Sequence, residues 1–225
     1  SHIITSPSAI VVSATSTPAS CNQSTGSVSS AATGGTGNLA YQWNTGATSS
    51  TINNLPAGTY TVTVTDDNGC TATGNANISN LAGPVISNTT TVNVSCHGGN
   101  NGSVSVSISG GAPPLSYQWS NGVTTSGNNS LTAGSYTITV TDANLCQASA
   151  TAVVTEPAAI AVLMNSTIAA CNNSTGSATA TANGGTGALG YQWSTGSTAA
   201  TISSLLPGLD TVTVTDQNSC SGSST

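Results

Sequence analysis

The segment Tyr60-Thr61-Val62-Thr63-Val64-Thr65 alternates apolar and hydroxyl-bearing side chains. Because successive side chains of a β-strand point to opposite faces, this alternation predicts a strand with one buried and one solvated face. Residues 136–141 repeat the pattern, and residues 103–109 repeat it with serine as the polar partner. No segment carries the apolar stripe of an amphipathic helix. The chain is therefore predicted to be all-β, with no significant helix.

The 225 residues consist of three tandem copies of one unit. The triplet Tyr-Gln-Trp occurs at residues 41–43, 117–119 and 191–193, each time after a double glycine and before a turn. Self-similarity at a fixed period indicates a tandem-repeat architecture. Several short strands per copy, separated by Gly, Pro and Asn turns, favour an antiparallel β-sandwich for each.

Prolines at comparable positions mark the junctions between the copies. We define repeat 1 as residues 8–83, repeat 2 as residues 84–156 and repeat 3 as residues 157–225. Residues 1–10 align without gaps to residues 151–160. Residues 1–7 are therefore expected to form the final strand of a preceding repeat, or of a neighbouring subunit's repeat. Repeat 3 is expected to lack its own last strand.

Each sandwich is expected to enclose one tryptophan, because the chain has no phenylalanine: Trp43, Trp119 or Trp193. Tyr60 and Tyr136 each follow a Leu-x-Ala-Gly-x sequence and are also assigned to the core. That spacing is typical of a tyrosine corner, in which the hydroxyl bonds to upstream backbone. Repeat 3 has Asp210 at this position instead.

Every repeat contains a first and a second cysteine at nearly equal spacing. This spacing favours pairing within each repeat: Cys21–Cys70, Cys96–Cys146 and Cys171–Cys220. Each bond would close a loop of about 50 residues and contribute roughly 4 kcal/mol in the chain-entropy model. Pairing between repeats would leave one cysteine unmatched at each end. Disulfides imply an oxidising compartment, so we expect an extracellular or cell-surface location.

The charge balance excludes several classes of function. The chain has no lysine or arginine and a formal net charge of −6. It therefore has nothing to neutralise nucleic-acid phosphates, and no polybasic patch for a membrane surface. The longest apolar run, residues 158–164, is too short to span a bilayer. We expect neither a nucleic-acid partner nor a membrane span.

No catalytic or cofactor-binding constellation is predicted. His2 and His97 have no metal partners at ligand spacing, and residues 185–190 fit a dinucleotide-loop pattern but precede a strand rather than a helix. The only metal candidates are weak calcium ligands in an Asp-x-Asn motif, for which Asx-turn chemistry is an equally good explanation. These candidates are Asp66, Asn68, Asp142, Asn144, Asp216 and Asn218.

Covalent glycans are expected on this surface. Serine and threonine number 74, and charged residues make up only 3% of the chain. Such a surface has few charges to keep the protein soluble, and attached sugars would supply that solubility. Asp210-Thr211-Val212 is similar to a short bacterial O-glycosylation sequon, so Thr211 is the candidate site.

The repeats resemble the SprB-type repeat of giant surface adhesins in gliding bacteria. The resemblance rests on Cys96-His97-Gly98-Gly99-Asn100-Asn101-Gly102-Ser103, on Tyr117-Gln118-Trp119-Ser120-Asn121-Gly122, and on residues 131–146. It implies immunoglobulin-like domains, export to the cell surface, and a role in adhesion or extracellular fibres. Repeats 1 and 3 replace the Gly-Gly-Asn-Asn run with Asn22-Gln23-Ser24-Thr25 and Asn172-Asn173-Ser174-Thr175.

The leading hypothesis is a structural and adhesive module of an extracellular filament or adhesin stalk, whose partners are copies of itself joined head to tail. In this arrangement, residues 1–6 of one copy complete repeat 3 of the preceding copy. One alternative is a glycan-binding module that meets surface polysaccharide, which two or more exposed tryptophans would favour. Another is an accessory segment of a secreted hydrolase.

Overall fold

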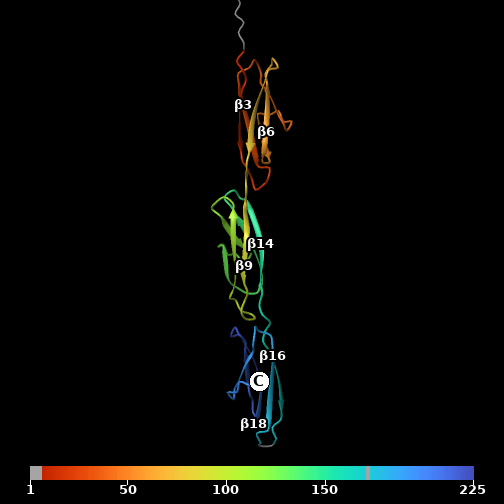
Figure 1. Ribbon diagram of the computed structural model, residues 1–225, viewed down its shortest axis with the longest axis vertical. Coiled ribbons are helices and arrows are strands. Elements are labelled where there is room, and N and C mark those ends of the chain that lie inside the picture. The colour runs from red at the N-terminus through yellow and green to blue at the C-terminus, as the bar shows by residue number, and fades with distance from the viewer. Residues whose placement is uncertain (1–6, 171–172) are drawn as a thin grey trace, which may run out of the picture. The chain divides into compact units, whose positions relative to one another are not determined.

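The computed structural model describes residues 7–170 and 173–225, and every regular element in them is a β-strand (Figure 1). The described residues include no helix, so the all-β prediction is confirmed. No helix that could cross a membrane is therefore present in this part of the chain. The expected strand at residues 1–6 lies outside the described residues.

Repeat 1 folds into two three-stranded antiparallel sheets, β1-β3-β5 and β4-β6-β7, accompanied by the short parallel pair β2-β8. Strands β3 and β6, one from each sheet, lie in opposite layers (Figure 1). The strands are β1 (Val11–Thr17), β2 (Ala19–Ser20), β3 (Gly26–Thr33), β4 (Ala40–Trp43), β5 (Thr51–Leu55), β6 (Gly58–Thr65), β7 (Thr71–Ile78) and β8 (Asn80–Leu81).

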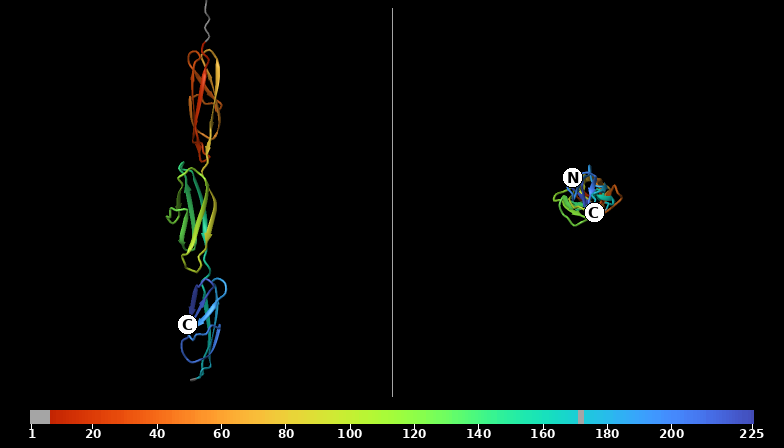
Figure 2. Two further views of the ribbon diagram at one scale, coloured as in Figure 1. Left: turned by 60° about the vertical axis from the view of Figure 1, so that its left-hand side comes forward. Right: turned by 90° about the horizontal axis from the view of Figure 1, so that it is seen from below.

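Repeats 2 and 3 use the same strand order. Their sheets are β9-β10-β12 and β11-β13-β14 in repeat 2, and β15-β16-β18 and β17-β19-β20 in repeat 3 (Figure 2). Repeat 2 contributes β9 (Pro84–Val92), β10 (Gly102–Gly110), β11 (Ser116–Trp119), β12 (Gly127–Leu131), β13 (Gly134–Thr141) and β14 (Gln147–Val154). Repeat 3 contributes β15 (Ala161–Thr167), β16 (Gly176–Asn183), β17 (Gly190–Trp193), β18 (Thr201–Leu205), β19 (Val212–Thr215) and β20 (Ser221–Ser224).

The described residues group into two compact units. One unit contains the residues up to 87 together with 108–118 and 138–150, and includes the core of repeat 1. The other contains residues 88–107, 119–137 and 151–225, and includes the core of repeat 3. Residues of repeat 2 belong to both units.

The core of repeat 1 follows directly from the alternation in β6. Val62 and Val64 are fully buried, and the threonines between them face the other side of the sheet. They pack around Trp43, which is 1% exposed and whose indole Nε1 donates to the Ser49 carbonyl at 2.9 Å. The bond satisfies the indole N–H, which is what lets so large a side chain be buried. Trp119 and Trp193 are equally buried, at 1% and 2% exposure.

The tyrosine corners form in the two repeats that have the tyrosine. Tyr60 donates from its hydroxyl to the Pro56 carbonyl at 2.9 Å, and Tyr136 donates to the Thr132 carbonyl at 3.1 Å. Tyr60 is buried and Tyr136 is half-buried. In repeat 3, the Asp210 carboxylate instead accepts a bond from a serine hydroxyl of the neighbouring turn.

The cysteine pairing predicted from spacing is wrong. The disulfides are Cys21–Cys146 and Cys96–Cys220, so none of the bonds Cys21–Cys70, Cys96–Cys146 and Cys171–Cys220 forms. Each disulfide joins the first cysteine of one repeat to the second cysteine of the next, across 125 or 124 residues. Cys70 is free and exposed, and Cys171 lies outside the described residues.

Strand length explains why pairing within a repeat fails. The Cys21 loop precedes β3 at the end of the sheet where Gly26 pairs with Leu55, whereas Cys70 lies in the β6–β7 hairpin beside Thr36, beyond the other end of β3. Eight residues of strand cover about 26 Å. A disulfide requires Cα atoms within about 7 Å. The two cysteines of one repeat are therefore too far apart to bond.

Reduction of both disulfides is expected to leave the sandwiches folded. No disulfide cysteine belongs to the tryptophan cores of repeats 1 and 3, so reduction removes no packing contact from these cores. Far-UV circular dichroism and tryptophan emission at 25 °C, before and after dithiothreitol, should be unchanged. A loss of β-sheet signal or a red shift of the emission would contradict this expectation.

Candidate functional site: an open groove in repeat 3

The edge strand of the second sheet is shorter in repeat 3 than in repeat 1. Strand β7 pairs with the whole of β6, from Thr65 opposite Thr71 to Gly58 opposite Ile78. Strand β20 is half as long, and pairs only with β19. In repeat 1 the second half of β7 pairs with the first half of β6. Within the described residues, the corresponding segment 208–211 of repeat 3 has no such antiparallel neighbour.

In the other two repeats, this second half-strand covers the core. Ile78 in repeat 1 and Val154 in repeat 2 are each 1% exposed. Each lies directly over a glycine of the neighbouring sheet, because a Cβ built on Gly26 would come 2.6 Å from Ile78, and one built on Gly102 would come 2.7 Å from Val154. Close approach over a glycine is one way a strand packs tightly against another sheet.

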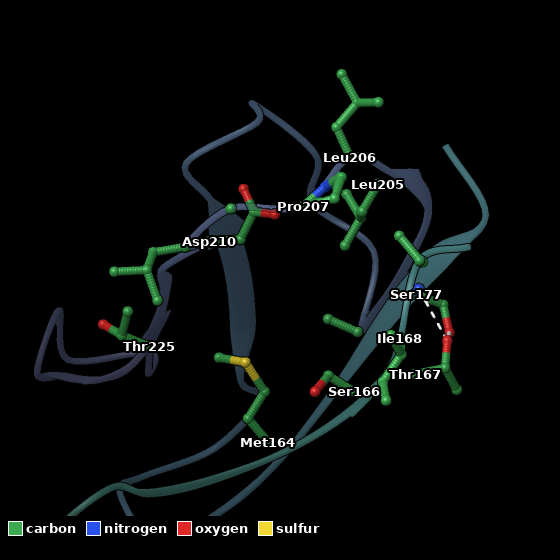
Figure 3. Close-up of a pocket in the computed structure, with 15 residues that line it drawn as sticks. Met164, Ser166, Thr167, Ile168, Ser177, Leu205, Leu206, Pro207, Asp210 and Thr225 are labelled. Carbon is green, nitrogen blue, oxygen red and sulfur yellow. Dashed lines mark hydrogen bonds between the residues drawn. The ribbon is translucent and has the colours of Figure 1, made fainter. Parts of the chain in front are cut away.

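The equivalent position over Gly176 of repeat 3 holds no such side chain. The three described atoms nearest to a Cβ built there belong to Leu205 and Ala169. The space is instead part of a groove with a volume of about 510 Å³. Met164 extends toward the middle of this groove from β15, as the close-up shows (Figure 3).

The rim of the groove is unusually apolar for a surface. Ile168, Leu206 and Leu209 line it and are 96%, 66% and 88% exposed. Leu206 points away from the groove and Asp210 lies on its far side from Ile168 (Figure 3). Clustered exposed apolar side chains mark an interaction surface more often than a free one.

Backbone groups along the groove are also available. In repeat 1 the Ala19 N–H donates to the Ser79 carbonyl, and in repeat 2 the Val94 N–H donates to the Thr155 carbonyl. Ala169 is the corresponding residue of repeat 3, and none of the described residues accepts a bond from its N–H. The groove therefore offers both an apolar floor and a strand edge, which are the two requirements for adding an extended peptide to a sheet.

The Asp-x-Asn motifs organise hairpins rather than gather ligands. Asp66 accepts the N–H groups of Asn68 and Cys70 at one carboxylate oxygen, and the N–H of Thr36 at the other. Asp142 and Asp216 make the equivalent bonds. The weak calcium candidates, Asp66/Asn68, Asp142/Asn144 and Asp216/Asn218, thus lie in three separate hairpins. No group of three or more His, Cys, Asp or Glu side chains gathers in the part of the chain that is described.

These bonds lower the pKa of each hairpin aspartate. For Asp66 and Asp142 the strongest influence is the N–H of a residue in a neighbouring loop, Thr36 after β3 and Ala112 after β10 respectively. For Asp216, burial is the strongest influence and raises the pKa, but three backbone N–H groups outweigh it and the pKa is lowered overall. All three carboxylates are held in the ionised form because a carboxylate accepts N–H bonds better than a carboxylic acid does.

Acidification is therefore expected to weaken all the hairpins together. The pKa of an aspartate in an unfolded chain is about 3.9, and the pKa of each of these three aspartates is lower in the folded chain. The contribution of the ionised carboxylates to the free energy of unfolding is complete well above that pH. It is lost as the pH falls through their pKa in the folded chain. The melting temperature should drop steeply below about pH 4. Asp66→Asn should lower the melting temperature at neutral pH and flatten this acid dependence for repeat 1, since an amide nitrogen would face the Thr36 N–H. An unchanged acid limb would contradict this assignment.

The remaining sequence candidates have structural surroundings. His97 Nδ1 lies 3.3 Å from Glu156 Oε1, a contact between residues far apart in sequence that spacing alone did not reveal. His2 lies outside the described residues. Gly185 has a positive φ, and a Cβ there would lie 2.9 Å from the Asp216 carboxylate, so this glycine serves a turn. Thr211 is half-buried, with its hydroxyl 3.2 Å from that of Thr225.

Residues 13–48 and 88–124 match the family model described as the SprB repeat. These two segments are similar to SprB repeats. Both matched segments run from the first strand of a sandwich to the turn after its Tyr-Gln-Trp strand. The SprB match therefore includes the first-cysteine loop and the buried tryptophan of repeats 1 and 2. No curated protein matches the chain in sequence.

Several solved structures are similar to this chain at low sequence identity. They include the N-terminal eight Ig domains of Down Syndrome Cell Adhesion Molecule isoform 1.30.30, at 14% identity and TM-score 0.45, covering 94% of this chain and 36% of that one. Sidekick-1 immunoglobulin domains 1–5 match at 11% identity and TM-score 0.37, covering 97% and 58%. Drosophila OTK extracellular domains 3–5 match at 10% identity and TM-score 0.31, covering 92% of each. The chain thus spans about a third to three-fifths of the first two structures.

Proposed function

We propose that this chain is a structural and adhesive module of an extracellular filament or surface-adhesin stalk, and that its copies join head to tail. SprB repeats and immunoglobulin-like sandwiches support a structural or adhesive module rather than an enzyme. Two disulfides support a location outside the cell. The observation that carries the assembly is the open groove of repeat 3, with its apolar rim and free strand edge.

The occupant of the groove is the N-terminal segment of a second copy. The gapless alignment of residues 1–10 to 151–160 places Ile4 at the position of Val154. Ile4 then fills the space over Gly176, and Ile3 takes the position of Val153, which is 60% exposed. The Thr5 carbonyl takes the position of the Thr155 carbonyl and accepts the bond from Ala169 N–H.

Charge complementarity also favours this segment. In repeat 1, Tyr60 of β6 is directly opposite Ala76 of β7. In repeat 3 the tyrosine is replaced by Asp210, and the alignment places His2 of the second copy opposite it. The tyrosine–alanine pair of repeat 1 is thereby replaced by an aspartate–histidine pair. Cross-strand pairs of opposite charge stabilise a sheet. Both replacements occur at the one junction that two copies would share.

The test compares two neighbouring isoleucines. Ile4→Asp places a charge in the apolar groove and is expected to abolish assembly, whereas Ile3→Asp lies on the solvated face and is expected to preserve it. Mass photometry of the full chain in reducing buffer measures the oligomers, and negative-stain microscopy shows whether they are filaments. Equal assembly by both variants would overturn the proposal.

A charge exchange provides the second arm of the test. His2→Asp alone places two carboxylates face to face and should weaken assembly, and the double variant His2→Asp/Asp210→His should restore it. Failure of the double variant to recover any assembly would argue against this register. Completion of the groove by some other segment would leave the wild-type chain monomeric, which also contradicts the proposal.

Covalent sugars on serine and threonine form part of the proposed surface. Support comes from the near absence of charged groups on a strand face built largely of hydroxyls. The intact mass of material from the native source is expected to exceed the 21.7 kDa of the polypeptide. A native mass equal to that of the polypeptide would refute glycosylation. No observation favours a glycan-binding site, because all three tryptophans are buried.

A further inference from the structure

The two disulfides differ in how openly their sulfur atoms lie. Cys146 is 2% exposed, whereas Cys96 and Cys220 are both half-buried and line a surface cavity of about 300 Å³. A volume of this size is at the lower end of the range for small-molecule pockets. The other walls of the cavity include Pro157, Ala159, Ile160, Gly185 and Ser221. The Cys96–Cys220 bond is therefore within reach of a small molecule.

The linkers that follow repeats 1 and 2 differ in length. The carbonyls of Ser79 and Thr155 accept equivalent backbone bonds at the ends of these repeats. Four residues separate Ser79 from Pro84, but Glu156 alone separates Thr155 from Pro157. The second linker is thus three residues shorter than the first.

The extra residues of the first linker cover its disulfide. Gly83 packs directly on Cys146, because a Cβ built on this glycine would lie 2.7 Å from the Cys146 Cβ. No residue of the second linker corresponds to Gly83, and a cavity lies beside Cys220 instead. The length of the linker thus explains why one disulfide is covered and the other is open.

The covered disulfide resists attack at either sulfur. Thiol–disulfide exchange requires access to the attacked sulfur and a stable leaving thiolate. Cys146 is too deeply buried for an incoming thiolate to reach. Attack at Cys21, which is half-buried, would leave a negative charge on the buried Cys146 sulfur, and such a charge is costly without a partner.

The surroundings of the open disulfide favour attack at Cys220. The Cys220 sulfur lies 3.3 Å from the Ser95 carbonyl oxygen, whose partial negative charge disfavours a thiolate on Cys220. His97 follows Cys96 and lines the same cavity, and an imidazole can supply a proton near neutral pH. Cys96 is therefore the better leaving group of the two.

The charges near the bond favour a thiol that carries no negative charge. Glu156 approaches His97 within 3.3 Å, and Asp216 accepts the Cys220 N–H at 2.9 Å. The chain has no lysine or arginine to offset these carboxylates. An anionic thiol is therefore repelled, whereas a cationic aminothiol is attracted.

We infer that the Cys96–Cys220 disulfide is a reversible exchange site for a small uncharged or cationic thiol. The incoming thiolate attacks the Cys220 sulfur, and its own sulfur is oxidised to a mixed disulfide. The Cys96–Cys220 bond breaks, its electron pair passes to Cys96, and that sulfur takes up a proton to become a thiol. Because one S–S bond forms as another breaks, no further oxidant is needed. All these residues lie in one copy, so the inference does not rest on the assembly proposed above.

The experiment uses the full chain with the substitutions Cys70→Ser and Cys171→Ser, so that the remaining cysteines are those of the two disulfides. The protein is incubated with excess cysteamine at neutral pH. Aliquots are quenched with acid, and free thiols are alkylated with N-ethylmaleimide. Mass spectrometry of peptic peptides measures the loss of each disulfide and locates the cysteamine adduct. Circular dichroism verifies that the variant is folded.

Cys96–Cys220 is expected to open about tenfold faster than Cys21–Cys146. At early times the cysteamine adduct should lie on Cys220 and the alkyl group on Cys96. The same chain unfolded in urea is the control. There both disulfides should open at similar rates, because the fold alone protects Cys146.

A second comparison tests the preference for charge. Cysteamine is cationic and mercaptoacetate is anionic, and the rate of each is divided by its rate with hydroxyethyl disulfide to remove intrinsic reactivity. The normalised rate at Cys96–Cys220 should be at least about threefold higher for cysteamine at low salt. The two rates should converge in about 1 M salt, where charges are screened.

A linker insertion tests the structural cause. Inserting Leu-Ala-Gly after Glu156 gives the second linker the length of the first and a glycine before its proline. This variant should open Cys96–Cys220 about fivefold more slowly, because access to the attacked sulfur limits exchange. Cys21–Cys146 is the internal control and should be unaffected. An unchanged rate at Cys96–Cys220 would contradict the role assigned to the linker.

Other outcomes overturn the inference. Equal opening of both disulfides in the folded chain, or faster opening of Cys21–Cys146, would show that the cavity gives no special access. An adduct on Cys96 would refute the direction of attack. A faster normalised reaction with mercaptoacetate would refute the class of thiol.

Discussion

Replacing Trp43 with alanine is expected to lower the free energy of unfolding of repeat 1 by about 3–5 kcal/mol. The indole is 1% exposed and packs among Val28, Val62 and Val64 in a core that has no phenylalanine. Its loss leaves a large cavity and also removes the donor from the Ser49 carbonyl. A domain has only about 5–15 kcal/mol of stability in total, so repeat 1 should be partly unfolded at 37 °C.

The other two tryptophans make the measurement selective. Trp119 and Trp193 lie in other repeats and report by fluorescence on whether those remain folded. Hydrogen exchange in β6 then measures repeat 1 directly. Gln42→Ala, on the same strand but exposed, is the matched control and should cost much less. Similar effects of the two substitutions would show that the core of repeat 1 does not depend on its tryptophan.

Val154→Asp is expected to detach the second half of β14, at a cost of about 4 kcal/mol. Val154 is 1% exposed and lies over Gly102, so the carboxylate would be buried without a partner. Its neighbour Val153 is 60% exposed, and Val153→Asp should cost about 1 kcal/mol or less. Urea unfolding of both variants, with hydrogen exchange of β12 and β14, measures the difference.

These two substitutions also indicate how much free energy a side chain in the groove of repeat 3 would contribute to assembly. Val154 occupies in repeat 2 the position that Ile4 of a second copy would take in repeat 3. The cost of Val154→Asp therefore bounds the loss of assembly energy expected from Ile4→Asp. A negligible cost would mean that the half-strand contributes little, and would remove the main support for strand exchange between copies.

Much of the fold was predictable because the chain repeats one simple pattern. Alternation in residues 60–65 correctly predicted a strand with one buried face, and the absence of helical periodicity predicted an all-β chain. The SprB resemblance was carried by residues around Cys96 and Trp119, and the family match includes both. These features depend on local sequence, which a single chain displays directly.

The disulfides were not predictable from spacing, for a physical reason. In a periodic sequence, a cysteine has equivalent partners in its own repeat and in the next one, so equal spacing favours neither. Strand length was the missing signal, since eight residues of β3 separate the two cysteines of a repeat by about 26 Å. The unmatched cysteine at an end, which counted against pairing between repeats, is the exposed Cys70 of the structure.

Contacts across long sequence distances were also missed. The contact between His97 and Glu156 connects the first-cysteine loop of repeat 2 to the residues after its last strand. Asn22 and Asn80 make an analogous amide pair in repeat 1. The apolar rim that Ile168 and Leu209 form around the groove of repeat 3 was not predicted, because it emerged only in three dimensions.

The crossed pairing of the cysteines has a mechanical consequence. The bonds Cys21–Cys146 and Cys96–Cys220 span overlapping stretches of the chain, which together extend from residue 21 to residue 220. A protease that cuts one peptide bond anywhere in that range leaves the two fragments tethered. Pulling on the chain likewise loads two covalent paths at each junction between repeats, the backbone and the disulfide. Bonds confined to single repeats would have left every junction dependent on one intact backbone.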